Sequence, residues 1–589
     1  MNLTDSDLRA ALKKHFGHEQ FRGAQLSMVR AVLEGRDVLF TLPTGGGKSL
    51  VYQLPAILLE GLTLVVSPLI ALMKDQVDGL RALGIRAAEV NSALSPKDRR
   101  RRLEAAQQGQ LDLLFITPER FRSPSFLEAL KRMHVTRLAV DEAHCISHWG
   151  HDFRPDYHRL GLYRELLGSP PTIALTATAT PDVAEDICQS LKLREPLVHL
   201  GGIERENLFM AATQVFLAEE KVPLLADRIS NIGGPGIVYS ALIRDLEHLH
   251  EELRRRGIHS LVYHGKLSSH ERKRMQERFM ASPSEVVLAT NAFGMGVDKA
   301  DIRFVLHAQI PRTLEAWAQE VGRAGRDGES ALCELIYFEE DVAIQQNFIN
   351  WANPSREYLV GVYETLRGWG ERLQAKDLDD LRDELLIKNR GDNRVAICLK
   401  WLEVLGVIEG AFENHNLRLV KDLDMDELPE FVGSEGKLRG DLEGLLGMVR
   451  FASGLECRRL SLNRHFGLPV EHETCDACDV CTDPQAWRAG HFEARPSGEH
   501  GTTSSARDAR QSAIPKAAQQ PRRAGAGSSS APAKEAFQRG DWVRIQGRGL
   551  GQVLRVDQHG GRVKLTIEDT HSLQRRSVDP AKVRVERLD

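Results

Sequence analysis

The sequence has few cysteines and little surplus charge. Eight cysteines in 589 residues are too few for a disulfide framework. A formal net charge of −4 excludes a protein that coats nucleic acid through bulk positive charge. Any polyanion would have to be bound by basic residues gathered along one groove. From the cysteine usage we expect a reducing, cytoplasmic setting.

Long hydrophobic runs are also scarce. The first 20 residues are polar and mixed in charge, so no secretory signal is expected. The most apolar stretch, residues 54–73, is interrupted by Pro55, Glu60, Gly61 and Pro68. We interpret it as a buried helix followed by a buried strand, and we expect no membrane segment.

Short apolar runs alternate with helical patterns between about residues 37 and 340. This alternation is typical of α/β domains whose parallel sheets are covered on both faces. Two series of runs predict two such domains, which join near residues 200–210. The expected strands are Val38–Leu42, Thr63–Val66, Asp112–Ile116, Leu138–Val140 and Ile173–Thr176, then Gly236–Tyr239, Leu261–Tyr263, Val286–Ala289, Phe304–His307 and Leu332–Tyr337.

The pattern changes after residue 355. Helical spacing at 355–368 and 393–405, followed by a hairpin at 407–420, gives the outline of a winged helix with Phe412 as its candidate wedge. An inert scaffold of three helices and a hairpin has the same outline. Residues 493–535 are rich in Ser, Ala, Gly, Pro and Gln, which predicts a flexible linker. Alternating runs from Phe537 onward predict a small SH3-like β-barrel.

The motif TGGGKS follows the first expected strand and precedes a helix. Glycines there let backbone N–H groups converge on phosphate oxygens, while Lys48 would bridge the β- and γ-phosphates of ATP and Ser49 would ligate Mg²⁺. The strict pattern has a glycine where Leu42 stands, so the match is good but incomplete. The predicted nucleotide-contacting residues are Thr44, Gly45, Gly46, Gly47, Lys48 and Ser49.

An acidic pair, Asp141 and Glu142, begins the motif DEAH at the end of the strand Leu138–Val140. An aspartate there suits Mg²⁺, and the adjacent glutamate suits a base for the attacking water. In the second domain, Arg323 and Arg326 are separated by two small residues and would reach across an interdomain cleft. There they would neutralise charge on the γ-phosphate, although structural salt bridges are the plainer alternative.

Taken together, these motifs resemble superfamily 2 helicases and, within them, the RecQ family of DNA helicases. The resemblance implies two tandem RecA-like domains. It also implies that Gln25 reads adenine, that Arg22 stacks on it, and that Asp298 belongs to the nucleotide-binding set. An aromatic-rich loop, Cys145–Pro155, follows the DEAH box and carries stacking platforms for DNA. The DNA-binding residues implied are Ser67, Pro68, Thr117, Trp149, His151, Phe153 and Arg154.

Four cysteines form the pattern C-x17-C-x2-C-x2-C. Thiolates at this density suit tetrahedral Zn²⁺ with no position open for water, which predicts a structural site. The spacing also resembles the RecQ zinc module. The predicted ligands are Cys457, Cys475, Cys478 and Cys481.

We therefore expect six parts. They are an ATP-binding domain (1–205), a second RecA-like domain (206–350), a winged-helix-like insertion (351–425), a helical zinc-binding module (426–485), a disordered linker (486–535) and a barrel (536–589). RecQ proteins usually place a winged helix after the zinc module, so the different layout here predicts weaker or more structure-selective unwinding.

The expected function is ATP- and Mg²⁺-dependent 3′–5′ movement on single-stranded DNA and unwinding of forked or junction DNA in repair or recombination. The polarity and the pathway come from the resemblance alone. The barrel would bind nucleic acid or a protein partner. Three alternatives stay open: an RNA helicase, a DNA translocase that does not separate strands, and a DNA-binding scaffold with a vestigial ATPase.

Overall fold

The computed structural model describes most of the chain up to residue 492 and five strands near its C-terminal end. The described residues are 3–43, 45–150, 152–201, 205–294, 297–387, 389, 391–470, 473–492, 542–545, 549–559, 562–569, 575–578 and 585–588. The chain divides into two units, Met1–Glu499 and His500–Asp589, and each is considered by itself. None of the helices in these ranges is both long and apolar enough to cross a membrane.

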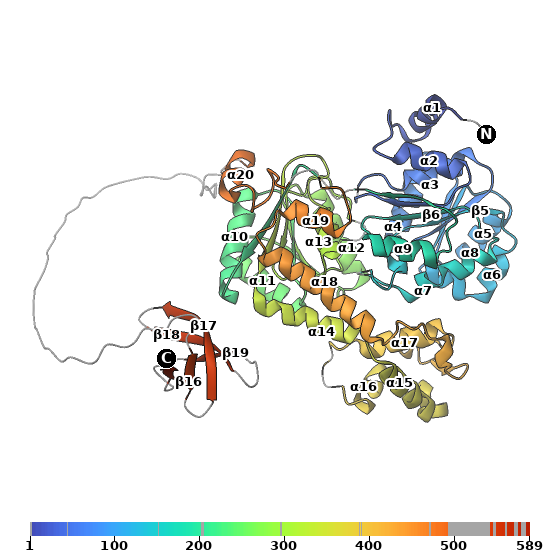
Figure 1. The fold of residues 1–589 in the computed structure, drawn as a ribbon. Helices are drawn as coiled ribbons and strands as arrows, with labels where there is room; N and C mark the ends of the chain where they lie inside the picture. The colour runs from blue at the N-terminus through green and yellow to red at the C-terminus, as the bar shows by residue number, and fades with distance from the viewer. Residues whose placement is uncertain are drawn as a thin grey trace, which may run out of the picture. The chain divides into compact units, whose positions relative to one another are not determined.

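The first lobe is built on a seven-stranded parallel sheet with strand order β3-β4-β2-β5-β6-β1-β7 (Figure 1). Apolar clusters cover both of its faces, which is why its central strands are fully buried. Its strands are β1 (Val38–Thr41), β2 (Leu62–Val66), β3 (Ala87–Val90), β4 (Leu113–Ile116), β5 (Val135–Val140), β6 (Thr172–Thr176) and β7 (Leu197–Leu200). Its helices are α1 (Asp5–Phe16), α2 (Gln25–Leu33), α3 (Leu50–Leu58), α4 (Ile70–Ala82), α5 (Pro96–Gln107), α6 (Pro124–Leu130), α7 (Pro155–His158), α8 (Leu160–Leu166) and α9 (Pro181–Ser190).

The second lobe repeats this plan with a six-stranded parallel sheet, in the order β10-β11-β9-β12-β13-β8. The change of sheet falls between Leu200 and Leu208. The expectation of two α/β domains with parallel sheets is confirmed. The strands are β8 (Leu208–Gln214), β9 (Gly236–Tyr239), β10 (Leu261–Tyr263), β11 (Val286–Ala289), β12 (Phe304–His307) and β13 (Ala331–Tyr337), and the helices are α10 (Lys221–Ile232), α11 (Ile243–Arg255), α12 (Ser269–Ala281) and α13 (Leu314–Val321).

Helices dominate residues 342–492. Helices α14 (Val342–Ala352) and α18 (Glu435–Ser453) lie side by side, and α18 also contacts α13 and β8 of the second lobe (Figure 1). Two further helices, α19 (Arg458–His465) and α20 (Pro484–His491), flank the cysteine cluster. Helix α20 includes residues 486–491, which were expected to begin the disordered linker, so that boundary is wrong. Trp487 anchors this helix, because its ring stacks on Phe209 with centroids 4.4 Å apart.

Between α14 and α18 lies a helical module, which we define as residues 356–432. It has its own apolar core. The predicted wedge, Phe412, is 6% exposed and packs against Trp369 in that core, so its expected role as a surface wedge is wrong. The module contains α15 (Arg356–Trp369), α16 (Leu378–Glu384), α17 (Arg394–Val404), β14 (Ile408–Glu409) and β15 (Arg418–Leu419).

The second unit contains a five-stranded antiparallel sheet in the order β19-β18-β17-β16-β20. Its strands are β16 (Trp542–Ile545), β17 (Gly549–His559), β18 (Arg562–Asp569), β19 (Arg575–Val578) and β20 (Val585–Leu588). The part of the predicted linker from residue 493 to 535 lies outside the described residues.

Candidate nucleotide, DNA and zinc sites

The glycine-rich loop lies between β1 and α3, at the carboxyl edge of the first sheet. Gly45 and Gly47 have φ angles of 84° and 79°, a region that favours glycine. Ser49 stands at the N-cap position of α3, and its hydroxyl contacts the Tyr52 hydroxyl. Lys48, which lies between Gly47 and Ser49 in the chain, is half-buried. Thr44 falls outside the described residues. The local geometry is that of a loop whose backbone can surround an anion at a helix N-terminus.

Gln25, the predicted adenine reader, is buried against this loop. Its amide nitrogen donates to the carbonyl oxygens of Gly46 and Gly47, each at 3.0 Å. Its amide oxygen accepts from the Arg22 backbone N–H at 2.8 Å. In this state Gln25 therefore ties the segment before α2 to the glycine-rich loop.

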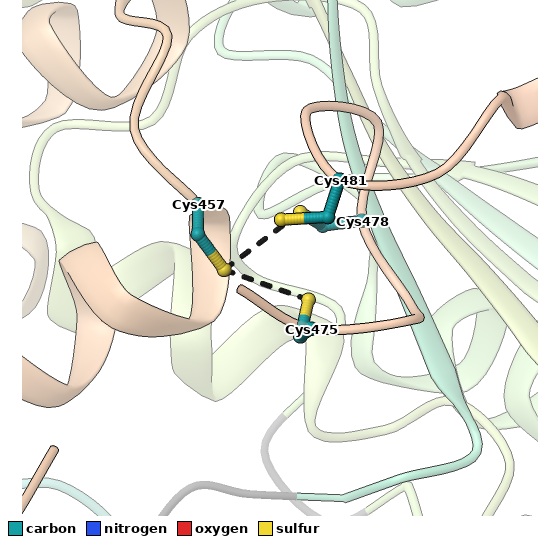
Figure 2. Close-up of side chains that lie close together, drawn as sticks. All are labelled: Cys457, Cys475, Cys478 and Cys481. Atoms are coloured by element: carbon teal, nitrogen blue, oxygen red, sulfur yellow. Dashed lines mark hydrogen bonds between the residues drawn. The ribbon is translucent and has the colours of Figure 1, made fainter. Parts of the chain in front are cut away.

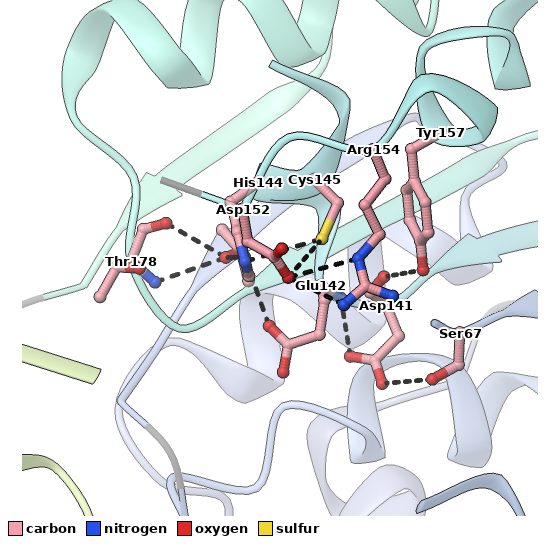
Figure 3. Close-up of polar contacts among 10 residues, drawn as sticks. Ser67, Asp141, Glu142, His144, Cys145, Asp152, Arg154, Tyr157 and Thr178 are labelled. Carbon is pink, nitrogen blue, oxygen red and sulfur yellow. Dashed lines mark hydrogen bonds and ion pairs between the residues drawn. The ribbon is translucent and has the colours of Figure 1, made fainter. Parts of the chain in front are cut away.

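Asp141 lies at the end of β5, between β2 and β6 in the sheet, and is 8% exposed. Burial, together with the neighbouring Glu142 carboxylate, raises the pKa of Asp141 to about 7, while the Lys48 ammonium opposes that rise. The Ser67 hydroxyl donates to the Asp141 carboxylate at 3.4 Å, and the Tyr157 hydroxyl donates to the Asp141 carbonyl at 3.0 Å (Figure 3). A buried carboxylate that approaches a lysine suits a metal-binding role.

His144 connects this acidic pair to the end of β6. Its Nδ1 forms a 2.8 Å hydrogen bond with the Thr176 hydroxyl and lies 3.4 Å from a Glu142 carboxylate oxygen. The Thr176 hydroxyl in turn donates to the Thr178 carbonyl at 3.1 Å. Neither His144 nor Thr176 is among the predicted site residues, although His144 lies in the DEAH motif after β5 and Thr176 ends the buried strand β6.

The aromatic-rich loop packs against the helical module. His148 stacks on Phe431 with centroids 4.4 Å apart and an interplanar angle of 8°. Phe153 lies edge-on to Phe431 at 5.3 Å and faces Trp401 at 6.1 Å. Trp149 remains 47% exposed.

Polar contacts fix the base of the same loop. The Asp152 carboxylate accepts from the Arg154 guanidinium at 2.9 Å and from the Cys145 thiol at 3.7 Å (Figure 3). His151 lies outside the described residues.

The remaining predicted DNA contacts belong to the first lobe. Ser67 and Thr117 are buried, and Pro68 is half-buried. The Ser67 hydroxyl is engaged with Asp141, so this residue lies at the acidic pair in this state.

The two predicted arginines differ in their surroundings. Arg323 is 5% exposed and donates to the Gly294 carbonyl within its own lobe. Arg326 pairs with Asp298 and donates to the Val297 carbonyl at 3.2 Å. It also reaches the other lobe, because a Cβ added at Gly45 would lie 3.4 Å from the Arg326 Cδ.

Both guanidinium groups keep unused donors. Within the described part of the chain, Nε and Nη2 of Arg326 and Nε of Arg323 are buried without a hydrogen-bond partner. A buried cationic donor without an acceptor is costly unless an anion completes the site. The first lobe's phosphate-type loop and Arg326 of the second lobe thus meet at one place.

The four predicted zinc ligands come together in one cluster. Their sulfur atoms lie within 4.8 Å of one another (Figure 2). Cys457 is 3.5 Å from Cys475 and 3.9 Å from Cys478, measured between Sγ atoms. Tetrahedral Zn–S bonds of about 2.3 Å place sulfur atoms about 3.8 Å apart, so the cluster fits this ion. All four ligands are protein thiolates, which makes a structural zinc site.

The zinc-binding loop also extends the second sheet. The Met210 N–H donates to the Ala477 carbonyl at 3.0 Å, and the Asp479 N–H donates to the Met210 carbonyl at 3.0 Å. The Asp479 carboxylate accepts from the Ala212 N–H at 2.9 Å. The loop therefore covers β8, which is an edge strand of its sheet.

Three family models match the chain along its length. They describe a DEAD/DEAH box helicase at residues 22–187, a helicase conserved C-terminal domain at 220–328, and a RecQ zinc-binding region at 423–482. The first two coincide with the lobes that carry the acidic pair and the arginines, and the third contains the cysteine cluster.

Curated relatives agree with these models. The chain is 45% identical over 344 residues to the ATP-dependent DNA helicase RecQ of Bacillus subtilis, covering 58% of each chain. It is 41% identical over 328 residues to the protein of that name from Pasteurella multocida, covering 56% of this chain and 52% of the relative. It thus spans somewhat more than half the length of these two relatives.

A third relative is matched more fully. The probable ATP-dependent DNA helicase RecS of Bacillus subtilis is 39% identical over 394 residues, which are 67% of this chain and 78% of that protein. With this coverage, and with a zinc-binding region that the RecQ model matches, the chain belongs to the RecQ family of ATP-dependent DNA helicases.

Proposed function

We propose that this protein hydrolyses Mg²⁺-ATP to move 3′ to 5′ along single-stranded DNA and to unwind forked or junction duplexes in repair or recombination. The observation that carries the proposal is the contact of Arg326 with Gly45. It brings buried, unpartnered guanidinium donors of one lobe to the phosphate-type loop of the other. Hydrolysis that requires both lobes is coupled to their relative motion.

Each polar group at this contact has an assigned role. The backbone of Thr44–Gly47 and the Lys48 ammonium bind the phosphates, and Ser49 and Asp141 hold Mg²⁺, which neutralises phosphate charge. Glu142 accepts the proton of the attacking water, and Arg323 and Arg326 stabilise charge on the γ-phosphate. Arg22, Gln25 and Asp298 bind the rest of the nucleotide. Adenine recognition by Gln25 requires its side chain to exchange the two carbonyls that it now contacts.

The DNA strand is proposed to bind across both lobes. Exposed Trp149 offers a stacking face, and stacking of one base on an aromatic ring contributes roughly 1–3 kcal/mol. Phe153 joins it only when it leaves the aromatic cluster of the helical module. Ser67, Pro68, Thr117, His151 and Arg154 complete the proposed set.

We further propose that the helical module is winged-helix-like and that the five C-terminal strands close into an SH3-like barrel. Three helices followed by paired strands support the first assignment, and five antiparallel strands support the second. The barrel, tethered by the linker, would bind nucleic acid or a protein partner. The six-part division of the chain and a reducing, cytoplasmic setting, which keeps zinc thiolates reduced, belong to the same proposal.

A translocase that remodels protein–DNA complexes without separating strands is the second candidate. Two observations favour it: β14 and β15 have two residues each, and Phe412 is buried. A hairpin of this size presents no exposed aromatic wedge in the described residues. A scaffold with a vestigial ATPase is disfavoured because the polar groups needed for hydrolysis are all present in the sequence.

The experiment compares single-stranded-DNA-stimulated ATP turnover and strand displacement for the parent chain and Arg326→Ala. Arg244→Ala, a change at an exposed arginine of the same lobe, is the matched control. We expect Arg326→Ala to lower kcat by about 100- to 1000-fold with little change in the KM for ATP, because the arginine acts in the transition state.

The outcomes separate the candidates. A parent protein with no polynucleotide-stimulated turnover would overturn the proposal. Turnover without displacement on tailed, forked and junction substrates would favour the translocase. Stronger stimulation by RNA than by DNA would identify an RNA helicase.

A further inference from the structure

The segment that enters the second lobe, residues 205–207, holds the loop that presents the two arginines, and we call it the interlobe linker. The Asn207 amide donates to the Gly325 carbonyl at 2.8 Å and to the Glu329 carbonyl at 2.7 Å. The Arg205 guanidinium donates to the Gly325 carbonyl and contacts the Gly322 carbonyl at 3.5 Å. These glycines immediately precede Arg323 and Arg326, so the linker fixes the backbone from which both side chains project.

Gly325 leaves this loop little freedom to move. Its φ angle is 53°, and a Cβ there would lie 2.5 Å from the Asn207 amide nitrogen and 2.7 Å from the Glu329 carbonyl oxygen. A displacement of the linker segment is therefore expected to displace the arginine loop, because the Asn207 amide fills the space beside Gly325 and is hydrogen-bonded to its carbonyl.

The linker segment is itself held by the zinc module. One guanidinium nitrogen of Arg459 donates to the carbonyl oxygens of Arg205, Glu206 and Leu208 at 3.0, 3.1 and 3.1 Å. Three carbonyls in four residues are thereby attached to a single side chain. Residues 205–208 are therefore expected to move with the second lobe.

Arg459 is placed by the zinc ligands. It follows Cys457 by two positions, in the first turn of α19. The intervening Arg458 pairs with Asp479 at 2.8 and 3.0 Å, and Asp479 lies between the ligands Cys478 and Cys481. Both ends of the cysteine cluster thus determine where α19 begins and where Arg459 points.

We propose that Arg459 is a positioning residue for ATP hydrolysis. It transmits the geometry of the zinc site through the linker to the loop that carries Arg323 and Arg326. This inference rests on the proposed function, because it assumes that the arginines act on the γ-phosphate. The zinc module would then affect ATP hydrolysis although none of its residues is proposed to contact the nucleotide.

The test measures kcat and the KM for ATP, with DNA in excess, for Arg459→Ala. Arg464→Ala is the matched control, since Arg464 lies on the same helix and pairs with exposed Glu456. Zinc content and thermal midpoint are measured for each protein. We expect Arg459→Ala to lower kcat roughly tenfold with unchanged KM and one bound zinc, and Arg464→Ala to match the parent.

A double variant tests the path itself. If Arg459 acts through Arg326, then adding Arg459→Ala to Arg326→Ala lowers kcat no further than about twofold. Multiplied losses in the double variant would overturn the proposal, and so would a parental kcat in Arg459→Ala. If Arg326→Ala itself keeps full turnover, the arginine assignment of the proposed function fails instead.

Asn207→Ala keeps the inference testable if Arg459→Ala loses zinc or does not fold. It removes the bonds to Gly325 and Glu329 without changing a residue of the zinc module. The same loss of kcat at constant KM, again absent in the Arg326→Ala background, supports the path. Parental turnover in Asn207→Ala contradicts it.

Discussion

At the scale of single residues, the burial of Asp141 sets the ionisation of its carboxyl group against folding. Burial beside Glu142 disfavours its charged form, and Lys48 together with the Ser67 hydroxyl offsets only part of that effect. The Mg²⁺ ion proposed for this site would favour the charged form. The folded protein therefore holds a carboxyl group whose ionisation opposes folding.

This leads to a pH-dependent stability. The pKa of Asp141 rises from 3.8 to about 7 on folding, so its contribution is fully present below pH 3.8 and is lost as the pH rises through 7. Asp141→Asn removes the charge, and we expect its thermal midpoint to exceed that of the parent by about 2–6 °C at pH 8 and by less at pH 5. Differential scanning fluorimetry without nucleotide or Mg²⁺ measures this.

Asp78→Asn, at an exposed position of α4, is the control and should give the same small difference at both pH values. A gain from Asp141→Asn that did not grow between pH 5 and pH 8 would contradict the prediction.

The identities of these residues were predictable from sequence, but their partners were not. The motifs predict Lys48 and Asp141 at one sheet edge because each follows a strand of the same sheet, and they predict Arg326 from its spacing to Arg323 in the second domain. Nothing in the spacing indicates that Gln25 bonds two carbonyls of the glycine-rich loop. Nor does it indicate that Ser67 turns toward Asp141, since such contacts depend on how distant strands pack.

At the scale of elements, α17 connects the helical module to the first lobe. Its Glu403 lies 2.5 Å from Arg122, its Lys400 lies 3.2 Å from Asp156, and the Val404 carbonyl accepts from Arg159. These contacts join the helical module to η1 (Pro118–Arg122) and α7 of the first lobe. The same module follows α14 and precedes α18, which pack on the second lobe.

Reversing one charge should loosen this contact. Glu403→Lys leaves the Asp156 carboxylate among Arg122, Lys400 and a new cation, and we expect amide hydrogen exchange across residues 147–159 to rise about three- to tenfold. Exchange followed by mass spectrometry measures it. Glu384→Lys, in exposed α16 of the same module, is the control. Equal exchange in both variants would show that α17 does not restrain the aromatic loop.

Sequence patterns located most of the elements and missed those with weak patterns. The Val- and Leu-rich strands β2 and β11 were predicted within a residue. The strand β3, with two alanines and Glu89, and the half-exposed edge strand β7 lack a clear apolar run. The strand β8 was also missed, because LFMAATQ is equally compatible with a helix.

At the scale of the whole molecule, every residue assigned to nucleotide or zinc lies in the first of the two units. The second unit contributes five strands after a long segment of linker composition. Its proposed action is to raise the local concentration of a partner, which leaves the chemistry of ATP unchanged.

A chain that ends at Phe492 tests this division, because it keeps α20 and the zinc module. We expect kcat within about twofold of the full chain. If the second unit binds DNA, the DNA concentration that half-saturates the ATPase rises in the shortened chain, and if the second unit binds a protein that concentration does not change. A loss of kcat beyond tenfold would show that the second unit acts in hydrolysis.

The pairing of the zinc-binding loop with the edge strand β8 has a consequence for molecules that lose their zinc. Oxidation or chelation of the four thiolates would release the Ala477–Asp479 segment and bare the backbone groups of Met210 and Ala212. An exposed sheet edge can pair with a strand from another molecule, so chains that have lost zinc would aggregate as well as lose activity. Metal supply would thereby determine the solubility of this protein.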